Sequence, residues 1–230
     1  MRITLLFILL SFIFSSPQNE KLFFTVKYKN IPAGTATIDF KNHFSDSTQY
    51  QINYSLKSKK FIDVFYKLRE NTSMLVSKID FSLEYINKKS RQGKYTKDHE
   101  ASIDYHQNKF FYNNKTFPIN NKVYDPIGVI YFLRKENLIQ QKEYYFSVYS
   151  SGKISQIKMQ YAGDDNINIG LKKYDCIIYE LYSSNNKAAL KNKGELKVWF
   201  SKEVGHIPLM IEQKGKYGKI ILKYNDRELY

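Results

Sequence analysis

The sequence predicts an all-β protein: a curved antiparallel sheet, or a partly open β-barrel, wrapped around one short buried helix. Three observations support this fold class. Apolar and polar residues alternate with a period of two in many segments, as in antiparallel sheets that bury one face. Turn signals separate these segments at short intervals without intervening helical patterns, which argues against β–α–β units. Only residues 125–137 have a clear helical pattern.

The first 18 residues have the pattern of a secretory signal peptide. Met1-Arg2 gives a positive start, the run from Ile3 to Phe14 is largely apolar, and small polar residues follow. This run is shorter than the about 20 residues of a membrane-spanning helix, although an uncleaved N-terminal anchor is the alternative. No later segment is expected to span a membrane as a helix. We therefore expect an exported, periplasmic or cell-envelope protein, soluble or peripherally attached, whose residues 19–230 form a single β-barrel-like domain.

The strands are predicted from rows of apolar residues that share one face of the sheet. The clearest rows are Leu22, Phe24, Val26 and Tyr28; Gly34, Ala36, Ile38 and Phe40; Tyr50, Ile52, Tyr54 and Leu56; Ile157, Met159 and Tyr161; and Ile220, Leu222 and Tyr224. Turns are expected at residues 30–34, 151–152, 163–165, 205–206 and 215–216. Residues 185–193 are polar and basic and predict a mobile loop. The segment from Phe61 to Leu68 fits either a short helix or a strand.

The helix is expected to begin at Asp125, because an Asp side chain caps free N–H groups and Pro126 suits the first helical position. The residues that follow are apolar almost all round, so the helix should be buried. Arg134 comes near its end, where an Arg can bond the last carbonyl groups and suits the negative end of the helix dipole. The alternative is that Arg134 lines a pocket and binds a carboxylate or phosphate.

The charge of the chain favours anionic partners. The net charge is +14 at pH 7, which attracts lipid headgroups or acidic glycans. Near a charged membrane each basic residue contributes roughly 1 kcal/mol. The alternatives are lysines spread over solvated strand faces, and a solvated hairpin end whose charge prevents edge pairing. Export argues against nucleic acid as a partner. Five basic residues without an intervening acid form the candidate surface: Lys88, Lys89, Arg91, Lys94 and Lys97.

Catalytic and metal-binding motifs are not found in the sequence. The histidines, His43, His99, His106 and His206, lack the spacing of a zinc site and are expected to lie at the surface. Cys176 is the single cysteine, which excludes an intramolecular disulfide and suits a buried strand thiol. No nucleophile elbow, phosphate-binding loop or dinucleotide fingerprint appears. We expect no cofactor, no metal and no enzymatic activity, with a hydrolase of unrecognised type as the alternative.

Three blocks of sequence resemble a known family. They are Ile31 to Ala36, Asp125 to Arg134, and Lys197 to Ser201 followed by His206 to Ile211 and Tyr217 to Ile220. Their order and spacing resemble the exported bacterial family catalogued as domain of unknown function 3108, over roughly residues 20 to 225. The resemblance implies a cell-envelope protein with a barrel-like antiparallel sheet, and no catalytic residues. A looser similarity links the chain to periplasmic lipoprotein carriers, whose curved half-barrels are closed by several helices over an apolar cavity.

Two functional hypotheses follow for a β protein with one helix. The leading one is a non-enzymatic envelope module that binds an apolar or amphiphilic ligand, such as a lipid, in the concavity of its sheet. Its predicted lining residues are Tyr54, Tyr131, Phe132 and Trp199, with Arg134 as the headgroup contact; Trp199 also suits a core position. The alternative is a scaffold or interaction protein whose helix fills the concavity and whose basic face meets anionic glycan, lipid headgroups or a protein partner.

Overall fold

The computed structural model describes residues 19–136, 138, 143–150, 152–183, 195–215 and 218–226. The predicted signal peptide and the predicted loop at residues 185–193 lie outside these described residues. Within them, no helix has the length and apolar character needed to cross a membrane. The elements are β1 (Glu20–Tyr28), β2 (Ile31–Asn42), β3 (Gln49–Ser58), α1 (Lys60–Asp63), β4 (Leu68–Ser77), β5 (Leu83–Gln92), β6 (Tyr95–Asp104), β7 (Lys109–Tyr112), β8 (Lys115–Pro118), β9 (Val123–Tyr124), α2 (Pro126–Lys135), β10 (Glu143–Ser150), β11 (Lys153–Ile169), β12 (Lys172–Ser183), β13 (Glu195–Ser201), β14 (Pro208–Gly215) and β15 (Gly218–Tyr224).

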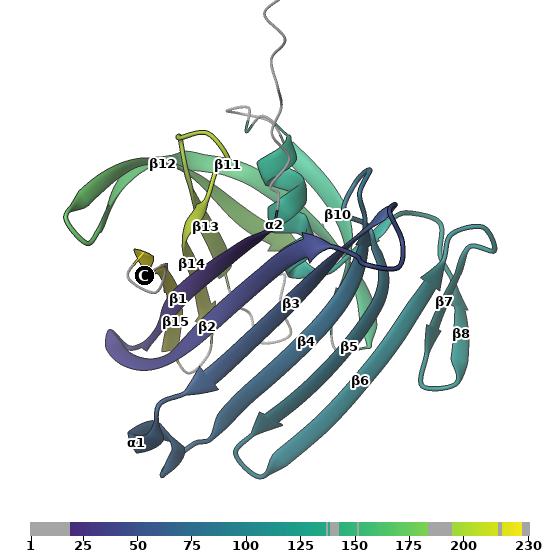
Figure 1. The fold of residues 1–230 in the computed structure, drawn as a ribbon, viewed down its shortest axis with the longest axis horizontal. Coiled ribbons are helices and arrows are strands. Elements are labelled where there is room, and N and C mark those ends of the chain that lie inside the picture. Colours follow the sequence, from purple (N-terminus) through teal and green to yellow (C-terminus); the bar gives the residue numbers. More distant parts are fainter. Residues whose placement is uncertain are drawn as a thin grey trace, which may run out of the picture.

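All fifteen strands belong to one curved sheet (Figure 1). Their order is β8-β7-β6-β5-β4-β3-β2-β1-β15-β14-β13-β12-β11-β10-β9. Neighbouring strands run antiparallel, except that β9 and β10 are parallel. The first and last strands meet in the middle of this order, where Phe24 of β1 pairs with Tyr224 of β15. The predicted fold class, an all-β protein with a curved antiparallel sheet around a short helix, is confirmed.

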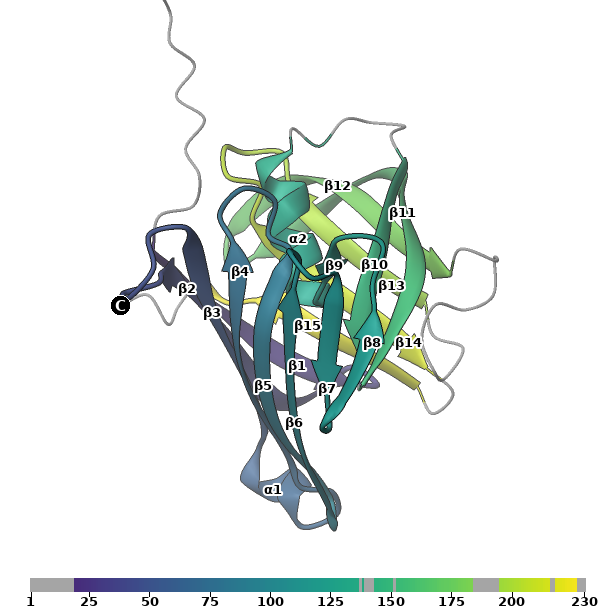
Figure 2. The ribbon, with the colours of Figure 1, turned by 90° about the vertical axis from the view of Figure 1, so that its right-hand side faces the viewer.

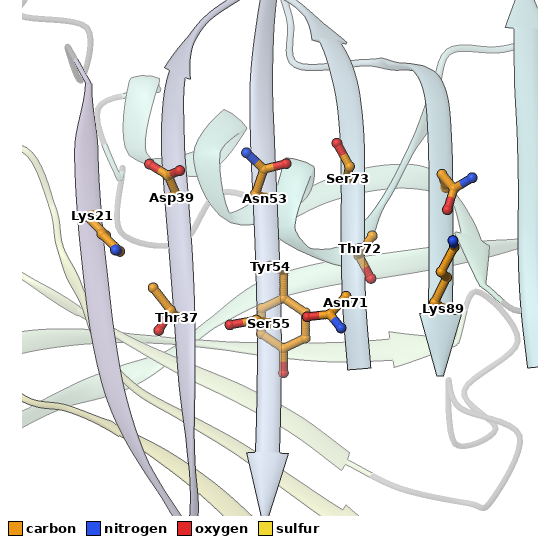
Figure 3. Close-up of a pocket in the computed structure, with 11 residues that line it drawn as sticks. Lys21, Thr37, Asp39, Asn53, Tyr54, Ser55, Asn71, Thr72, Ser73 and Lys89 are labelled. Atoms are coloured by element: carbon orange, nitrogen blue, oxygen red, sulfur yellow. The ribbon is translucent and has the colours of Figure 1, made fainter. Parts of the chain in front are cut away.

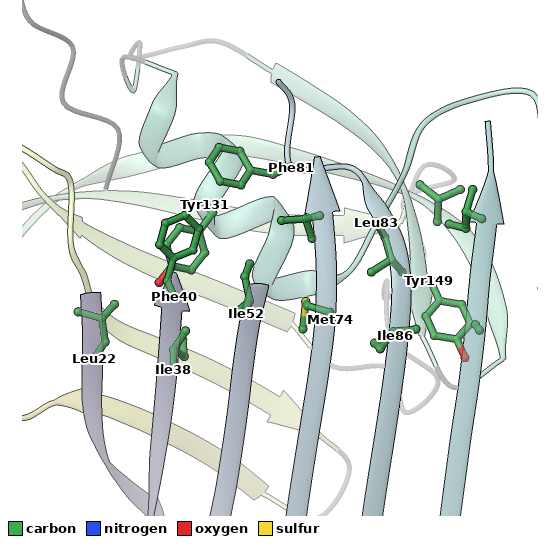
Figure 4. Packing of buried hydrophobic residues seen from close by; sticks show 14 of the residues in the cluster. Leu22, Ile38, Phe40, Ile52, Met74, Phe81, Leu83, Ile86, Tyr131 and Tyr149 are labelled. Carbon is green, nitrogen blue, oxygen red and sulfur yellow. The ribbon is translucent and has the colours of Figure 1, made fainter. Parts of the chain in front are cut away.

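Helix α2 lies on the concave face of the sheet and covers only one end of it (Figures 1 and 2). The Asp125 side chain accepts a hydrogen bond of 2.8 Å from the backbone N–H of Ile127, so the predicted N-cap is confirmed. Tyr131 of α2 stacks on Phe40 of β2, with ring centroids 4.5 Å apart. Figure 4 shows these rings among the buried side chains that β1 to β5 direct toward the helix. The helix is therefore buried, as its apolar sequence predicts.

Some of the predicted turns lie elsewhere in the structure. The first turn is at Lys29 and Asn30, both with positive φ, and β2 already begins at Ile31. Gly34 lies within β2, where a Cβ atom would collide with the backbone of β3 at Lys57. The turn predicted at residues 163–165 is wrong: these residues belong to β11, which has a bulge between Tyr161 and Gly163. The bulge reverses which side chains of β11 face inward, so Ile167 and Ile169 beyond it lie on the outer face, in a separate core with Trp199.

Candidate functional site

The strand register divides the concave face of β2 to β6 into rows. Phe40 heads a row that is apolar and buried throughout, running on to Ile52, Met74, Ile86 and Ala101. The next row changes character and runs Ile38, Tyr54, Thr72, Lys88 and His99. We call the first row, with Phe81 and Tyr131, the helix end of the concave face. We call the side chains of Tyr54, Glu70, Thr72, Lys88 and His99 the polar end.

The polar end contains one ion pair and one hydroxyl group without a partner. Lys88 Nζ lies 2.5 Å from Glu70 Oε1, and both side chains keep some exposure, 30% and 17%. The hydroxyl of Thr72 is buried and has no hydrogen-bond partner among the described residues. His99 Nδ1 lies 2.9 Å from the hydroxyl of Tyr112. A cation and a carboxylate thus lie beside a buried hydroxyl that has no partner among the described residues.

Burial changes the ionisation of several groups on this surface. It lowers the pKa of His99, and the charges of Lys97 and Lys88 lower it further, so His99 is neutral at pH 7. Burial also raises the pKa of the Tyr54 phenol well above its ordinary value. Asp125 is affected in the same direction: burial raises its pKa to about 6, against the opposing effects of the Ile127 N–H group and Lys88. The charges of Lys88 and Glu70 at the polar end therefore act on the Asp125 carboxyl group.

Apolar side chains adjoin the polar groups. Leu56 lies next to Tyr54 on the same face of β3, and Leu68 precedes Glu70 on β4. Leu222 and Ile220 face them from β15, through the pairing of β1 with β15. All four side chains are half-buried. This part of the concave face therefore offers both apolar contacts and hydrogen-bonding groups.

The predicted headgroup contact, Arg134, is used by the fold itself. Arg134 is buried and forms a bidentate ion pair with Glu20, in which Nη2 and Oε2 are 3.0 Å apart. Its Nε donates to the carbonyl oxygen of Gly205 at 2.9 Å, and its guanidinium group lies 4.9 Å from the ring centre of Tyr131. The carbonyl that it bonds is therefore in the loop before β14 rather than at the end of α2. Every side of this side chain is engaged within the protein.

The predicted lining residues have different surroundings. Tyr54 is half-buried at the polar end, whereas Tyr131 is fully buried at the helix end. Phe132 is half-buried and packs edge-on against Tyr124 and Phe146. The structure thus brings Tyr54 alone of these three next to the polar cluster.

Trp199 lies on the outer face of the sheet, away from α2. It pairs with Ile178 and Met210, packs in a small separate core, and donates a 3.0 Å hydrogen bond from Nε1 to Asp165. Ile167 and Ile169 of the long β11–β12 hairpin join the same core. Cys176 is buried there as predicted, and burial raises its thiol pKa to about 11. Trp199 therefore takes the core position that its sequence allowed rather than a place in the concavity.

The five basic residues of the candidate surface do not share one face. Lys88 and Lys97 lie on the concave side, because they pair with Thr72 and Ser90 of that face. Lys89 and Arg91 lie on the outer side, and Lys94 is in the β5–β6 turn. Alternation along the two strands accounts for this division.

Three members of the polar end, Glu70, Thr72 and His99, were not predicted from the sequence, nor was the effect of the nearby Asp125 charge. The prediction that His99 lies at the surface is wrong, since its side chain is buried. A signal was present, because His99, Ala101 and Ile103 alternate on one face of β6. Polar residues at positions of an otherwise apolar row therefore indicate an inward-facing polar cluster. Within the described ranges, no group of three or more metal-binding side chains is found.

The outer face of β1 to β5 carries a polar groove (Figure 3). Its volume is about 400 Å³. In Figure 3 its side chains point away from α2, on the opposite side of the sheet from the Tyr54 ring. Tyr54 and Thr72 contribute to its lining, and the lining side chains of the outer face are mostly amides and hydroxyls with charged groups at the margins: Lys21, Thr37, Asp39, Asn53, Ser55, Asn71, Ser73, Asn87 and Lys89.

The curved sheet and its single covering helix define a class of β-barrel-like proteins. A solved structure described as a beta-barrel-like protein of domain of unknown function DUF1849, from Brucella abortus, has a TM-score of 0.60 to this chain. The match covers 89% of this chain and 94% of the other at 9% sequence identity, so it concerns the fold. The chain itself belongs to the family described as Protein of unknown function (DUF3108), whose model matches residues 24–224. The predicted family is thus confirmed. A search of the curated proteins found no match.

Proposed function

We propose that this chain is a non-enzymatic protein of the cell envelope that binds an amphiphilic ligand, such as a lipid, at the polar end of its concave face. The main support for the proposal is that the concave face changes along its strands from covered apolar side chains to partly exposed polar ones. Helix α2 covers the helix end, whereas Tyr54, Glu70 and Lys88 beyond it remain partly exposed. The signal-peptide pattern of residues 1–18 supports the envelope location.

The chemistry of this surface suits a molecule with one apolar and one polar part. Leu56 and Leu222 offer apolar contacts to a hydrocarbon chain. The hydroxyl of Thr72 is buried without a partner, which costs about 1–3 kcal/mol. A headgroup that accepts a hydrogen bond from this hydroxyl recovers that cost, and Lys88 adds a cation beside it. Ligand sites of this kind combine apolar walls with a few placed polar groups.

Native mass spectrometry of the purified mature protein tests the proposal, with oleate and mono-oleoylglycerol as defined probes in calorimetric titrations. We expect co-purified lipid and binding of both probes. Lys88→Met should weaken oleate binding about tenfold by removing the cation. Lys172→Met is the matched control, because Lys172 is also ion-paired but lies at the start of β12, away from the concave face of β2 to β6. A protein without bound lipid that binds neither probe contradicts the proposal.

The outer groove favours a second candidate function, the binding of an acidic glycan. Asn71 and Asn87 point into the groove and have no hydrogen-bond partner among the described residues, while Lys21 and Lys89 flank them. Amides and hydroxyls of this kind suit a polyhydroxylated ligand, and the two cations suit uronate carboxylates. Titration with an oligogalacturonate tests it: Asn71→Ala with Asn87→Ala should abolish binding that Asn114→Ala, in the turn between β7 and β8, leaves intact. Equal binding by both variants contradicts this function.

A further inference from the structure

The end of the sheet farthest from α2 carries two neighbouring turns (Figures 1 and 2). One turn contains α1, and the other joins β5 to β6. The backbone N–H of Gly93 donates a 2.8 Å hydrogen bond to the carbonyl of Lys67, which fastens the two turns together. The ring of Tyr66 lies against Gly93, where an added Cβ atom would be 3.3 Å away. We call residues 57–67 and 91–95 together the α1 tip.

Large apolar side chains of the α1 tip point into solvent. None of the residues of α1 is buried. An exposed apolar group of this size on a folded chain commonly marks an interaction surface. The exposed fractions are 53% for Phe61, 79% for Val64, 87% for Phe65, 51% for Tyr66 and 59% for Tyr95.

The polar groups of the tip explain why the apolar ones remain outside. Asp63 is the one acidic residue in these two ranges, and it forms an ion pair with Arg69 at the start of β4. Arg69 also bonds the hydroxyl of Ser58, at 2.9 Å, and the carbonyl of Leu68, at 2.7 Å. The Ser58 hydroxyl in turn accepts from the N–H of Leu68 at 2.8 Å. This network holds the turn in one shape with its aromatic side chains outward.

Cations surround the exposed apolar side chains. No ion pair joins these cations to an acid within the part of the chain that the structure describes, and the paired Asp63 leaves the tip strongly positive. Aromatic side chains beside lysines are the composition of protein segments that lie in a membrane interface, where rings enter the headgroup region and lysines meet anionic lipid. The cations are Lys57, Lys59, Lys60, Lys67, Arg91 and Lys94.

We propose that the α1 tip docks the protein on an anionic lipid bilayer, with Phe65 and Val64 inserted and the lysines in contact with acidic headgroups. The occupant is a bilayer because the tip combines five exposed apolar groups with six unpaired cations, whereas an acidic protein partner would need only the charge. The inference goes beyond ligand binding at the polar end and does not require it. Docking in this orientation turns that end of the concave face toward the membrane.

Flotation with vesicles tests the docking, using phosphatidylcholine alone and phosphatidylcholine with phosphatidylglycerol in a ratio of about seven to three. We expect binding to the anionic vesicles that weakens as salt rises. Phe65→Asp should lower the partition coefficient at least about tenfold, and Lys59→Glu with Lys60→Glu by a similar factor. Phe44→Asp is the matched control, since Phe44 is 102% exposed in the β2–β3 turn at the opposite end of the strands. Its partition should not change.

A site-specific probe keeps the test independent of variant stability. Cys176 is buried, so an environment-sensitive dye attached to Phe65→Cys reports the tip alone. Its emission should shift to the blue on anionic vesicles, and the same dye at Phe44→Cys should not respond. Failure of the anionic vesicles to bind, equal binding to both vesicle types, or retained binding by Phe65→Asp each overturns the proposal. Sedimentation that shows a dimer lost on Phe65→Asp, without vesicle binding, assigns the tip to a second copy of the chain instead.

Discussion

The helix end and the polar end of the concave face belong to the same strands yet have different packing. At the helix end, Phe40 and Tyr131 stack and exclude solvent. Two positions along the same strands, Tyr54 and Lys88 remain partly exposed and polar groups interrupt the apolar rows. The difference shows that α2 is a partial cover: it completes the core at one end and leaves the other as a surface.

Removing an aromatic ring should cost far more at the helix end than at the polar end. Tyr131→Ala leaves a cavity where the side chain is fully buried and should lower the free energy of unfolding by about 4 kcal/mol. Tyr54→Ala should cost less than half of that, because Tyr54 is half-buried. Urea unfolding followed by circular dichroism measures both. Equal losses would show that the two ends are packed alike.

Breaking the ion pair at the helix end, Glu20 with Arg134, should also cost more stability than breaking the pair at the polar end, Glu70 with Lys88. Glu20→Ala leaves the buried Arg134 without its counter-ion and should destabilise the fold by about 3 kcal/mol. Glu70→Ala frees Lys88, which is 30% exposed and can be solvated, so the loss should stay below about 1 kcal/mol. The same urea titration compares them. A larger loss for Glu70→Ala would mean that the polar end is closed to water.

Asp125 should give the stability a pH dependence opposite to that of an ordinary acid. Its native pKa of about 6 exceeds the unfolded value of 3.8, so between these pH values the native state binds more protons. The free energy of unfolding should therefore fall as pH rises from about 4 to 6, by up to about 2 kcal/mol. Asp125→Asn keeps the helix cap and removes the buried charge, so it should be the more stable protein at pH 7 and equal below pH 4.

Asp46 is the control for the pH dependence of stability expected from Asp125. Hydrogen bonds from Thr48 lower the pKa of Asp46, so its stabilising effect is present at neutral pH and is lost on acidification. Asp46→Asn should therefore reduce stability at pH 7, the reverse of Asp125→Asn. Two variants with the same sign would show that Asp125 is fully solvated.

The smallest effect is expected at Thr72, and it separates stability from binding. Thr72→Val removes a buried hydroxyl that has no partner within the described residues, so it should stabilise the ligand-free protein by about 1 kcal/mol. The same change should weaken the binding of mono-oleoylglycerol. Thermal unfolding and calorimetry measure the two effects. A destabilised variant would show that the hydroxyl already has a partner in the protein.

Local sequence patterns predicted where strands and the helix occur, but they did not predict which residues from distant parts of the chain come into contact. Ile38 and Phe40 share a buried face because they are two positions apart in one strand, and Asp125 caps the helix that starts next to it. Both predictions depend only on residues close in the sequence, and both were confirmed. The ion pair of Arg134 with Glu20 joins residues 114 positions apart and depends on the order of strands, which no local pattern contains. Trp199 faces outward by simple alternation with Val198 and Phe200. Its neighbours Ile167 and Ile169 reach that face only through the bulge after Tyr161, a backbone irregularity without a distinct composition. The polar end was missed because each polar residue in an apolar row looks like a surface residue until the rows are aligned.

The pairing of β1 with β15 has a consequence for how the chain folds. On either side of this pair, neighbouring strands follow one another along the chain as antiparallel hairpins, except for the parallel pair β9 and β10, so each half can assemble from largely local contacts. The joint between the halves needs the last strand, because Phe24 pairs with Tyr224. Closing such a long loop is slow, and the sheet cannot be completed until β15 is available to pair with β1. A chain built in this way keeps its sheet open between β1 and β15 until both strands are present.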